Sequence, residues 1–260
     1  MEQYTGFARV YDEYMDNVPY DKWTAHLQRA LNGFGIKDGI VCELGCGTGE
    51  VTRRMRDFGF DMIGIDSSAE MLEAARQKEK PGDERILYLH QDMREFELYG
   101  SVTAVISVCD SLNYILSKRD MMKVFRRVNN FLDIGGVFLF DMHTEHYYRN
   151  VLADSVICDN RSDSSLIWMN QYDGKKRINY FDITIYDRDE SGKYSRFDET
   201  HIQRAYTEQE IGELLHKAGM ELLWCRKAYT NRKHTDTDQR IWYAAKTLKK
   251  SDGVYAIGTL

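Results

Sequence analysis

The sequence predicts an α/β fold in which helices cover both faces of a mostly parallel sheet. Short apolar runs alternate along the chain with amphipathic segments, a pattern typical of strands separated by covering helices. The first apolar run leads through a glycine-rich turn, residues 45–49, directly into a helical pattern. Two later apolar runs end at Asp66 and Asp92. These features favour a doubly wound sheet with a ligand groove at the carboxyl ends of its strands.

Strands and helices alternate in chain order. The predicted strands are 41–44, 60–66, 85–91, 102–108, 137–140, 220–226 and 240–247. The predicted helices are 48–58, 67–80, 118–132 and 207–218. Ser67 or Ser68 caps the second helix, which ends before Pro81. Thr207 and Glu210 have the spacing of a capping box for the last helix.

An N-terminal segment, residues 1–35, lies outside this alternating core. It is rich in aromatic side chains, and Phe7, Tyr11 and Tyr14 recur at helical spacing. We expect a helical cover that either packs its apolar stripe on the core or acts as a lid over the ligand groove.

A second additional segment, residues 150–206, separates the fifth strand from the last helix. Its β-rich runs are 166–172, 177–187 and 194–206. Gly174 and Gly192 mark turns between them, which predicts a three-stranded antiparallel meander. Ile183 and Ile185 alternate with polar neighbours, so one face should be buried. A sheet inserted here should lie over the carboxyl edge of the parent sheet, where it either roofs a substrate pocket or forms a homodimer surface.

The composition is typical of an intracellular enzyme. With 260 residues and 43% hydrophobic content, the chain can bury a full core as one domain with additions. Its formal charge of −6 argues against general affinity for nucleic acid or anionic membranes, which require a basic surface. No apolar run approaches the roughly eighteen residues of a membrane helix, and no signal-peptide pattern is present, so we expect a cytoplasmic location. The five cysteines form no Cys-x-x-Cys pair, which predicts neither a disulfide framework nor a zinc site.

The ends of the first three strands carry ordered motifs at consistent spacing. They are Glu43-Leu44-Gly45-Cys46-Gly47-Thr48-Gly49, then Gly64-Ile65-Asp66-Ser67-Ser68 with Met71-Leu72, then Gln91-Asp92-Met93. Asp66 lies about twenty residues beyond the glycine turn, where a doubly wound sheet places a carboxylate for ribose hydroxyls. In these motifs the chain resembles the class I methyltransferases that use S-adenosylmethionine, over residues 36–141 and again over 207–247.

The resemblance implies a Rossmann-like methyltransferase sheet of seven strands, with the antiparallel β-meander inserted into it. The core would comprise residues 36–149 and 207–247, followed by a tail, 248–260. The last two strands would pair as an antiparallel hairpin on the sheet edge.

The resemblance also implies how S-adenosylmethionine is bound. Gly45, Cys46 and Gly47 would pass their backbone along its methionine portion. Glu43 would lie near the amino group, and Asp66 would accept hydrogen bonds from the ribose hydroxyls.

The remaining implied contacts reach the adenine ring and the sulfur. Asp92 would accept from the adenine amine, the Met93 backbone amide would face the ring, and Cys109 would border the sulfur. Aromatic faces can stabilise a sulfonium cation by roughly 0.5 to 2 kcal/mol. Further cofactor contacts are expected from Ser67, Met71, Tyr11 and Trp23.

The motif after the fourth strand, Cys109-Asp110-Ser111-Leu112-Asn113-Tyr114, should face the methyl group. Enzymes of this fold that methylate nucleobase amines or glutamine amides commonly carry Asn or Asp, two prolines and an aromatic residue here. Both prolines are absent in this chain, which counts against those substrates. The motif instead resembles bacterial small-molecule methyltransferases, including amino-sugar and amino-acid N-methyltransferases with similar inserted sheets. We therefore expect a small-molecule acceptor, with N-methylation favoured over O-methylation.

His143 and His146 follow the fifth strand and are candidates for a catalytic base, because imidazole titrates near neutrality. They could equally be polar residues opening a short helix, 144–151. Asp110 and Asn113 could instead bind an amine. No third ligand accompanies the two histidines in a metal-binding arrangement, so no metal is expected.

Other interpretations stay open at this point. His201, Gln203 and Arg204 of the inserted sheet could contact the substrate or form a solvated strand face. The whole chain could also be a non-catalytic S-adenosylmethionine-binding protein, or an NAD-dependent oxidoreductase on a related sheet.

Overall fold

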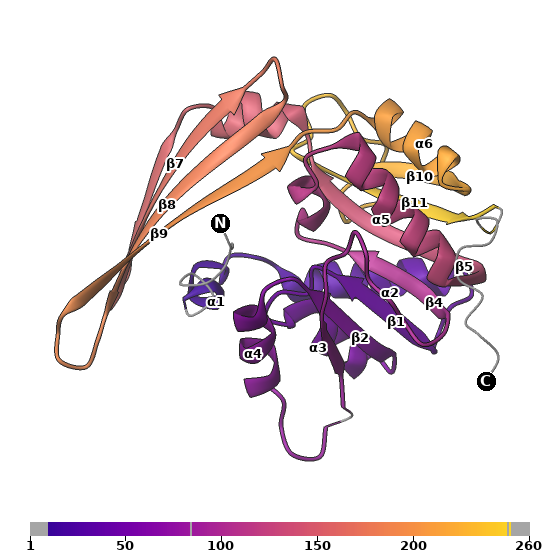
Figure 1. Cartoon of the computed structure of the whole chain (residues 1–260), viewed down its shortest axis with the longest axis horizontal. Helices are drawn as coiled ribbons and strands as arrows, with labels where there is room; N and C mark the ends of the chain where they lie inside the picture. Colours follow the sequence, from indigo (N-terminus) through magenta and orange to yellow (C-terminus); the bar gives the residue numbers. More distant parts are fainter. Residues whose placement is uncertain (1–9, 84, 249, 251–260) are drawn as a thin grey trace.

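The main body of the protein is a mixed sheet whose strands lie in the order β10-β11-β5-β4-β1-β2-β3 (Figure 1). The computed structural model describes residues 10–83, 85–248 and 250. The strands are β1 Ile40–Leu44, β2 Asp61–Asp66, β3 Leu87–His90, β4 Val102–Ser107, β5 Leu132–His143, β10 Met220–Lys227 and β11 Arg240–Thr247. β1 to β5 pair in parallel, whereas β11 is antiparallel to both β5 and β10. The predicted fold class and the antiparallel pair at the sheet edge are confirmed.

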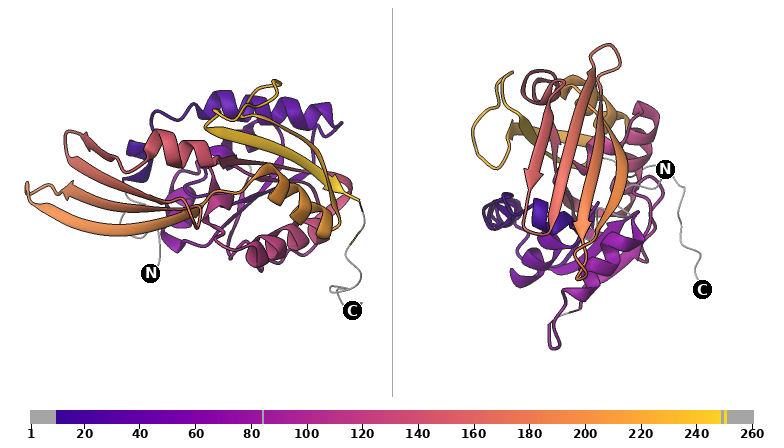
Figure 2. Two further views of the ribbon diagram at one scale, coloured as in Figure 1. Left: turned by 90° about the horizontal axis from the view of Figure 1, so that it is seen from above. Right: turned by 90° about the vertical axis from the view of Figure 1, so that its left-hand side faces the viewer.

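Helices cover the sheet from both sides (Figures 1 and 2). They are α1 Tyr11–Tyr14, α2 Tyr20–Gly33, α3 Glu50–Asp57, α4 Ala69–Gln77, α5 Lys118–Phe131 and α6 Glu208–Lys217. Helices α2, α3 and α4 contribute to one hydrophobic core, and α5 and α6 contribute to the other. Successive residues of a strand point to opposite faces, so Val41 packs in the first core and Cys42 in the second. Both faces of the sheet are therefore buried in hydrophobic cores.

The inserted sheet has four strands, β6 Val156–Asn160, β7 Ser164–Asp173, β8 Ile178–Arg188 and β9 Tyr194–Arg204. The prediction of three strands was wrong, because β6 is mostly exposed and shows no alternation of apolar and polar residues. The expectation of one buried face is confirmed by Ile183 and Ile185, which are 7% and 0% exposed. This face packs against Val10, Tyr11 and Tyr14. The inserted sheet projects from the core, and α1 lies beside it (Figure 1).

Several element boundaries differ from the prediction. β5 begins immediately after α5 and is much longer than predicted, with Gly135 at a φ of +87° inside it. The short helix after β5 is the π-helix η3, Tyr147–Leu152. Phe7 and most of the predicted tail lie outside the described residues. Among the described helices, none is long and apolar enough to cross a membrane.

Candidate functional site

A cavity of about 680 Å³ lies at the carboxyl ends of β1 to β4. Parallel strands end at the same edge of the sheet, which is why residues distant in sequence meet there. The walls also include residues from α1 and the start of α2. The predicted cofactor residues that line it are Tyr11, Glu43, Gly45, Cys46, Gly47, Asp66, Ser67, Met71, Asp92, Met93 and Cys109. A cavity of this size suits a small organic ligand.

The glycine turn forms the floor between β1 and α3. Gly45 and Gly47 have φ values of +72° and +53°, a conformation that other residues rarely adopt. The Gly45 N–H donates to the Ile65 carbonyl at 2.8 Å, which folds the turn back onto β2. A Cβ on Gly45 would lie 2.6 Å from the Ser111 Cβ. The turn can therefore hold its backbone at the cavity wall only with glycine at this position.

Asp66 ends β2 beside this turn. Its carboxylate accepts the N–H groups of Gly47 at 2.8 Å and Ser68 at 2.9 Å. Burial raises the pKa of Asp66, while these backbone hydrogen bonds oppose that rise. Each carboxylate oxygen has a second lone pair, so the group is fixed in place and can still accept a hydrogen bond from a ligand.

Asp92 and Met93 follow β3 and line the same cavity. The Asp92 carboxylate accepts the N–H of Arg94 at 2.8 Å and the Arg94 Nε–H at 2.9 Å. Burial acts to raise the pKa of Asp92, but its hydrogen bonds with Arg94 outweigh this and lower it. Asp92 is therefore an ionised acceptor held at the wall.

Glu43 is a buried carboxyl group that lines the cavity at the end of β1. It accepts a hydrogen bond of 2.5 Å from the Thr52 hydroxyl. Burial, with a contribution from the charge of Asp66, raises the pKa of Glu43 to about 8. A ligand ammonium group placed beside Glu43 would favour the ionised form, so the site fits a ligand that carries one.

Aromatic rings surround the end of the cavity near Cys109. Tyr11, Tyr20 and Tyr114 all line it. Burial raises the pKa of the Tyr11 phenol, and the neighbouring Tyr20 adds to the shift. Burial also raises the pKa of the Cys109 thiol, so this sulfur is not a thiolate nucleophile.

Trp23, which the sequence predicted as a cofactor contact, is placed elsewhere. Its ring stacks on Tyr229 with centroids 4.3 Å apart, and the Arg240 guanidinium lies 5.3 Å from its centroid. Tyr20, one helical turn earlier, lines the cavity instead. Helical spacing alone could not show which of the two rings α2 turns toward the cavity.

The predicted catalytic residues Asp110 and His143 are held in a charged cluster with Arg240. One Arg240 nitrogen donates to Asp110 at 2.6 Å and lies 2.7 Å from His143 Nε2. His143 Nδ1 lies 3.2 Å from the Gln239 carbonyl, and the Asp110 carboxylate also accepts from Gln203 at 2.7 Å. Neither Asp110 nor His143 is among the residues that line the cavity, and their catalytic role stays a prediction. His146 lies at the start of η3, as the alternative interpretation expected.

Asn113 is also held by hydrogen bonds. It is fully buried, and its amide donates to the carbonyls of His143 at 3.2 Å and Arg204 at 2.8 Å. Its oxygen accepts the His143 N–H at 3.0 Å. Asn113 therefore ties the end of β5 and the end of β9 to the segment after β4, and its catalytic role stays a prediction.

Asp141 supports the backbone that faces the cavity. Cys109 and Asp110 have φ values of +57° and +55°, which is unusual for residues other than glycine. The fully buried Asp141 accepts the N–H of Cys109 at 3.3 Å and that of Asp110 at 2.8 Å. It also accepts from Arg240 at 2.7 Å and from the Tyr229 hydroxyl. Sequence reasoning missed Arg240 and Tyr229 in this role, since both approach from the C-terminal hairpin.

The inserted sheet brings two more polar side chains to the site. His201 and Gln203 on β9 are 1% and 2% exposed, so the interpretation as a solvated strand face is wrong for both. The Tyr114 hydroxyl lies 3.1 Å from His201 Nδ1, and His201 Nε2 lies 3.0 Å from a Glu199 oxygen. Arg204 donates to the Leu116 carbonyl at 3.0 Å.

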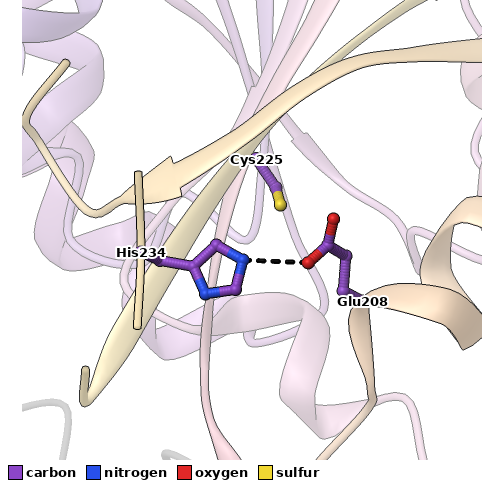
Figure 3. Close-up of side chains that lie close together, drawn as sticks. All are labelled: Glu208, Cys225 and His234. Atoms are coloured by element: carbon purple, nitrogen blue, oxygen red, sulfur yellow. Dashed lines mark hydrogen bonds and ion pairs between the residues drawn. The ribbon is translucent and has the colours of Figure 1, made fainter. Parts of the chain in front are cut away.

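Away from the cavity, Glu208, Cys225 and His234 bring metal-ligand atom types within 4.8 Å of one another (Figure 3). His234 Nε2 lies 2.9 Å from a Glu208 oxygen, and the Cys225 thiol donates to the same carboxylate. Burial raises the pKa of Cys225 to about 12, so its sulfur is protonated at neutral pH. The three groups form a hydrogen-bonded cluster, in which His234 Nδ1 has no hydrogen-bond partner among the described residues.

Comparison with known proteins gives consistent results. A model of the methyltransferase domain matches residues 41–136. YqeM of Bacillus subtilis (strain 168), a methyltransferase by name, is 36% identical over 95% of this chain and 98% of its own length. A crystal structure of an S-adenosylmethionine-dependent methyltransferase from Clostridium acetobutylicum ATCC 824 superposes with a TM-score of 0.84 at 28% identity, covering 95% of this chain and 99% of that one. The sugar N-methyltransferase KedS8 from Streptoalloteichus sp ATCC 53650 shares the fold, with a TM-score of 0.74 at 16% identity over 92% of this chain and 93% of that one.

Proposed function

Because this chain belongs to the S-adenosylmethionine-dependent methyltransferases, we propose that it methylates an amine nitrogen of a small molecule. S-adenosylmethionine, when bound, supplies a methyl group on a positively charged sulfur. The protein must bind this cofactor, align the acceptor with it, exclude water and leave the acceptor nitrogen unprotonated.

The cofactor residues have the properties that this binding mode needs. Glu43 is a buried carboxyl that gains from an ammonium partner, which supports its placement beside the methionine amino group. Asp66 is held by two backbone N–H groups and retains lone pairs for ribose hydroxyls. Asp92 and Met93 lie together at the wall, as an adenine site would need.

The acceptor end of the cavity favours a cationic amine. Tyr11, Tyr20 and Tyr114 present aromatic rings there, and such rings attract cations. Behind Tyr114 lies a buried carboxyl group, Glu199, which reaches the cavity through His201. This ring-lined end with a buried carboxyl behind it is the observation that carries the proposal of N-methylation, because an amine is positively charged before it reacts and an alcohol is not.

The inserted sheet supports a small acceptor. His201 and Gln203 of β9 contact Tyr114 and Asp110, and the buried face of the sheet packs on Tyr11. We therefore propose that residues 150–206 roof the acceptor site. KedS8, a sugar N-methyltransferase, shares this fold across nearly all of its length, which is consistent with an amine acceptor of that size.

The test has two stages. Calorimetry should first show that the purified protein binds S-adenosylhomocysteine. The enzyme is then incubated with labelled S-adenosylmethionine and paired acceptors that differ only in carrying an amino or a hydroxyl group, such as amino sugars and their parent sugars. Mass spectrometry should find methyl groups on nitrogen in the amino compounds. Methylation confined to hydroxyl compounds, or to macromolecules in the same assay, would reject the proposed acceptor.

A further inference from the structure

A chain of three side chains runs from the cavity wall into the protein interior. Tyr114 lines the cavity, its hydroxyl lies 3.1 Å from His201 Nδ1, and His201 Nε2 lies 3.0 Å from a Glu199 oxygen. His201 is 1% exposed and Glu199 is 8% exposed. The buried pair, His201 and Glu199, is therefore connected to the cavity through contacts with Tyr114.

The fold holds this geometry firmly. Glu199 and His201 are two residues apart on β9, so both point to the same, inward face of the sheet. The backbone of β9 is tied to the segment carrying Tyr114, because Asn113 donates to the Arg204 carbonyl and Gln203 donates to Asp110. Three residues from two distant parts of the chain are thus kept in register.

We propose that Tyr114, His201 and Glu199 form a proton relay that deprotonates the amine acceptor before methyl transfer. This inference rests on the proposed function. In the relay, Glu199 accepts the Nε2–H of neutral His201, which leaves the Nδ1 lone pair to accept the Tyr114 hydroxyl proton. The arrangement follows the logic of a serine, histidine and aspartate triad, in which a buried carboxylate fixes the tautomer and stabilises the imidazolium that forms.

The proton and electron balance is simple. The acceptor ammonium gives one proton to the Tyr114 oxygen while the Tyr114 hydroxyl proton passes to His201 Nδ1. The nitrogen lone pair so released forms a bond to the methyl carbon as the carbon–sulfur bond breaks, and that bonding pair stays on sulfur. The proton on His201 returns to solvent after product release.

Within the part of the chain that the structure describes, the other titratable groups near Tyr114 do not compete in this role. Tyr11 and Tyr148 lie close to the Tyr114 phenol, and burial raises the pKa of both. Asp110 is also near, but the charges of His143 and Arg240 outweigh its burial and hold its pKa well below the usual range. Asp110 therefore stays ionised throughout the range in which an amine loses its proton.

Nitrogen-15 NMR of the histidine rings tests the relay without any acceptor. In the protein with S-adenosylhomocysteine added, neutral His201, identified by the signals lost in His201→Asn, should carry its proton on Nε2. Glu199→Gln should lower the protonation midpoint of His201 by about one pH unit, because the stabilising negative charge is lost. Glu208→Gln is the matched control, since it alters the other hydrogen-bonded Glu–His pair and should leave His201 unchanged. A proton on Nδ1 in the wild type, or an unchanged midpoint in Glu199→Gln, would overturn the relay. If His201→Asn does not fold, the His201 ring signals can be assigned instead as the histidine signals that shift in Tyr114→Phe.

Kinetics with an amine found by the acceptor assay provides the second test. Tyr114→Phe should lower kcat about a hundredfold at pH 7, the usual size of a general-base contribution, and the loss should shrink as pH rises and the amine deprotonates by itself. The affinity of Tyr114→Phe for S-adenosylhomocysteine should be unchanged.

Tyr194→Phe, at a tyrosine that is 56% exposed on the inserted sheet, is the control. A wild-type rate in Tyr114→Phe, or a loss that does not vary with pH, would reject the relay alone. Absence of N-methylated product in the wild type would reject the proposed function, and NMR would still judge the relay geometry.

Discussion

At the scale of single residues, Glu43 makes a testable prediction about pH. Its carboxyl has a pKa raised to about 8, so it is mostly protonated at pH 6. A cofactor ammonium would pair with the ionised form, so binding should release a proton below pH 8. Affinity for S-adenosylhomocysteine should therefore rise about tenfold between pH 6 and pH 7, following the ionised fraction of this group. Calorimetry at several pH values measures the trend directly.

Two variants separate Glu43 from other titrating groups. Glu43→Gln should bind more weakly at pH 8 and lose the pH dependence. Glu73→Gln, on the exposed face of α4, should keep the wild-type trend. Affinity that is flat or falls from pH 6 to pH 7 in the wild type would show that Glu43 does not pair with the ligand.

Arg240 makes a prediction about stability. Its side chain is 16% exposed and bridges Asp110 and Asp141, at 2.6 and 2.7 Å. Arg240→Met would leave two carboxylates close together in the interior, so we expect it to lower the free energy of unfolding by about 3 to 5 kcal/mol. Urea denaturation followed by circular dichroism measures the change.

The matched control is another arginine–aspartate pair. Arg196 lies 2.8 Å from Asp198, with side chains 58% and 57% exposed. Arg196→Met should change stability by about 1 kcal/mol or less, because exposed ion pairs contribute little. An equal decrease in the free energy of unfolding in the two variants would mean that the Arg240 cluster stabilises the protein no more than an exposed ion pair does.

At the scale of elements, Asn113 connects β5 and β9 to the segment after β4. Asn113→Ala would remove the hydrogen bonds that its side chain makes with the His143 N–H and with two carbonyls, which should cost about 3 kcal/mol. Hydrogen exchange should accelerate in β9 more than in β1. The control is Asn231→Ala, at an exposed position, for which a change within about 0.5 kcal/mol is expected. Uniform acceleration across the sheet would contradict the local role.

The elements that could be predicted are those with a local signal. The glycine turn, Asp66 and Asp92 each follow an apolar run, and the strand order of a doubly wound sheet brings them together without further information. β6 lacked such a signal, because an exposed edge strand needs no apolar alternation. The contact between the inserted sheet and the cavity wall was harder to predict. His201 meets Tyr114 across 87 positions of sequence, and that contact exists only because the inserted sheet docks on the core.

The same reason explains why the cluster of Asp110 and His143 with Arg240 was not predicted. Both residues follow strands whose ends lie at the cavity, so the sequence pattern placed their side chains there. Their partner Arg240 lies on β11, which pairs with β5. A cation that reaches two carboxylates from another strand cannot be found from local spacing. Polar residues at a strand end therefore divide into ligand contacts and structural pairs only when the opposite partner is known.

At the scale of the whole molecule, α1 links the glycine turn at the cavity wall to the inserted sheet. Asp12 accepts a hydrogen bond of 2.5 Å from the Thr48 hydroxyl in the glycine turn and pairs with Lys78, the residue that follows α4. Two residues later, Tyr14 donates to Ser164 on β7 at 2.8 Å. The interpretations of α1 as a packed helix and as a cover are thus compatible, since it contacts both parts.

This link predicts which parts of the molecule ligand binding stabilises. S-adenosylhomocysteine at a hundred times its Kd should stabilise the protein by about 2.7 kcal/mol and raise Tm by roughly 5 to 10 °C, whereas NADH should not. Hydrogen exchange should slow in the glycine turn and also in α1 and β7, because α1 fixes the turn against the inserted sheet. Asp12→Asn should keep the protection of β2 but reduce that of β7, since the ion pair with Lys78 is lost. Protection confined to β1, β2 and β3 in the wild type would show that the inserted sheet is independent of the cofactor site.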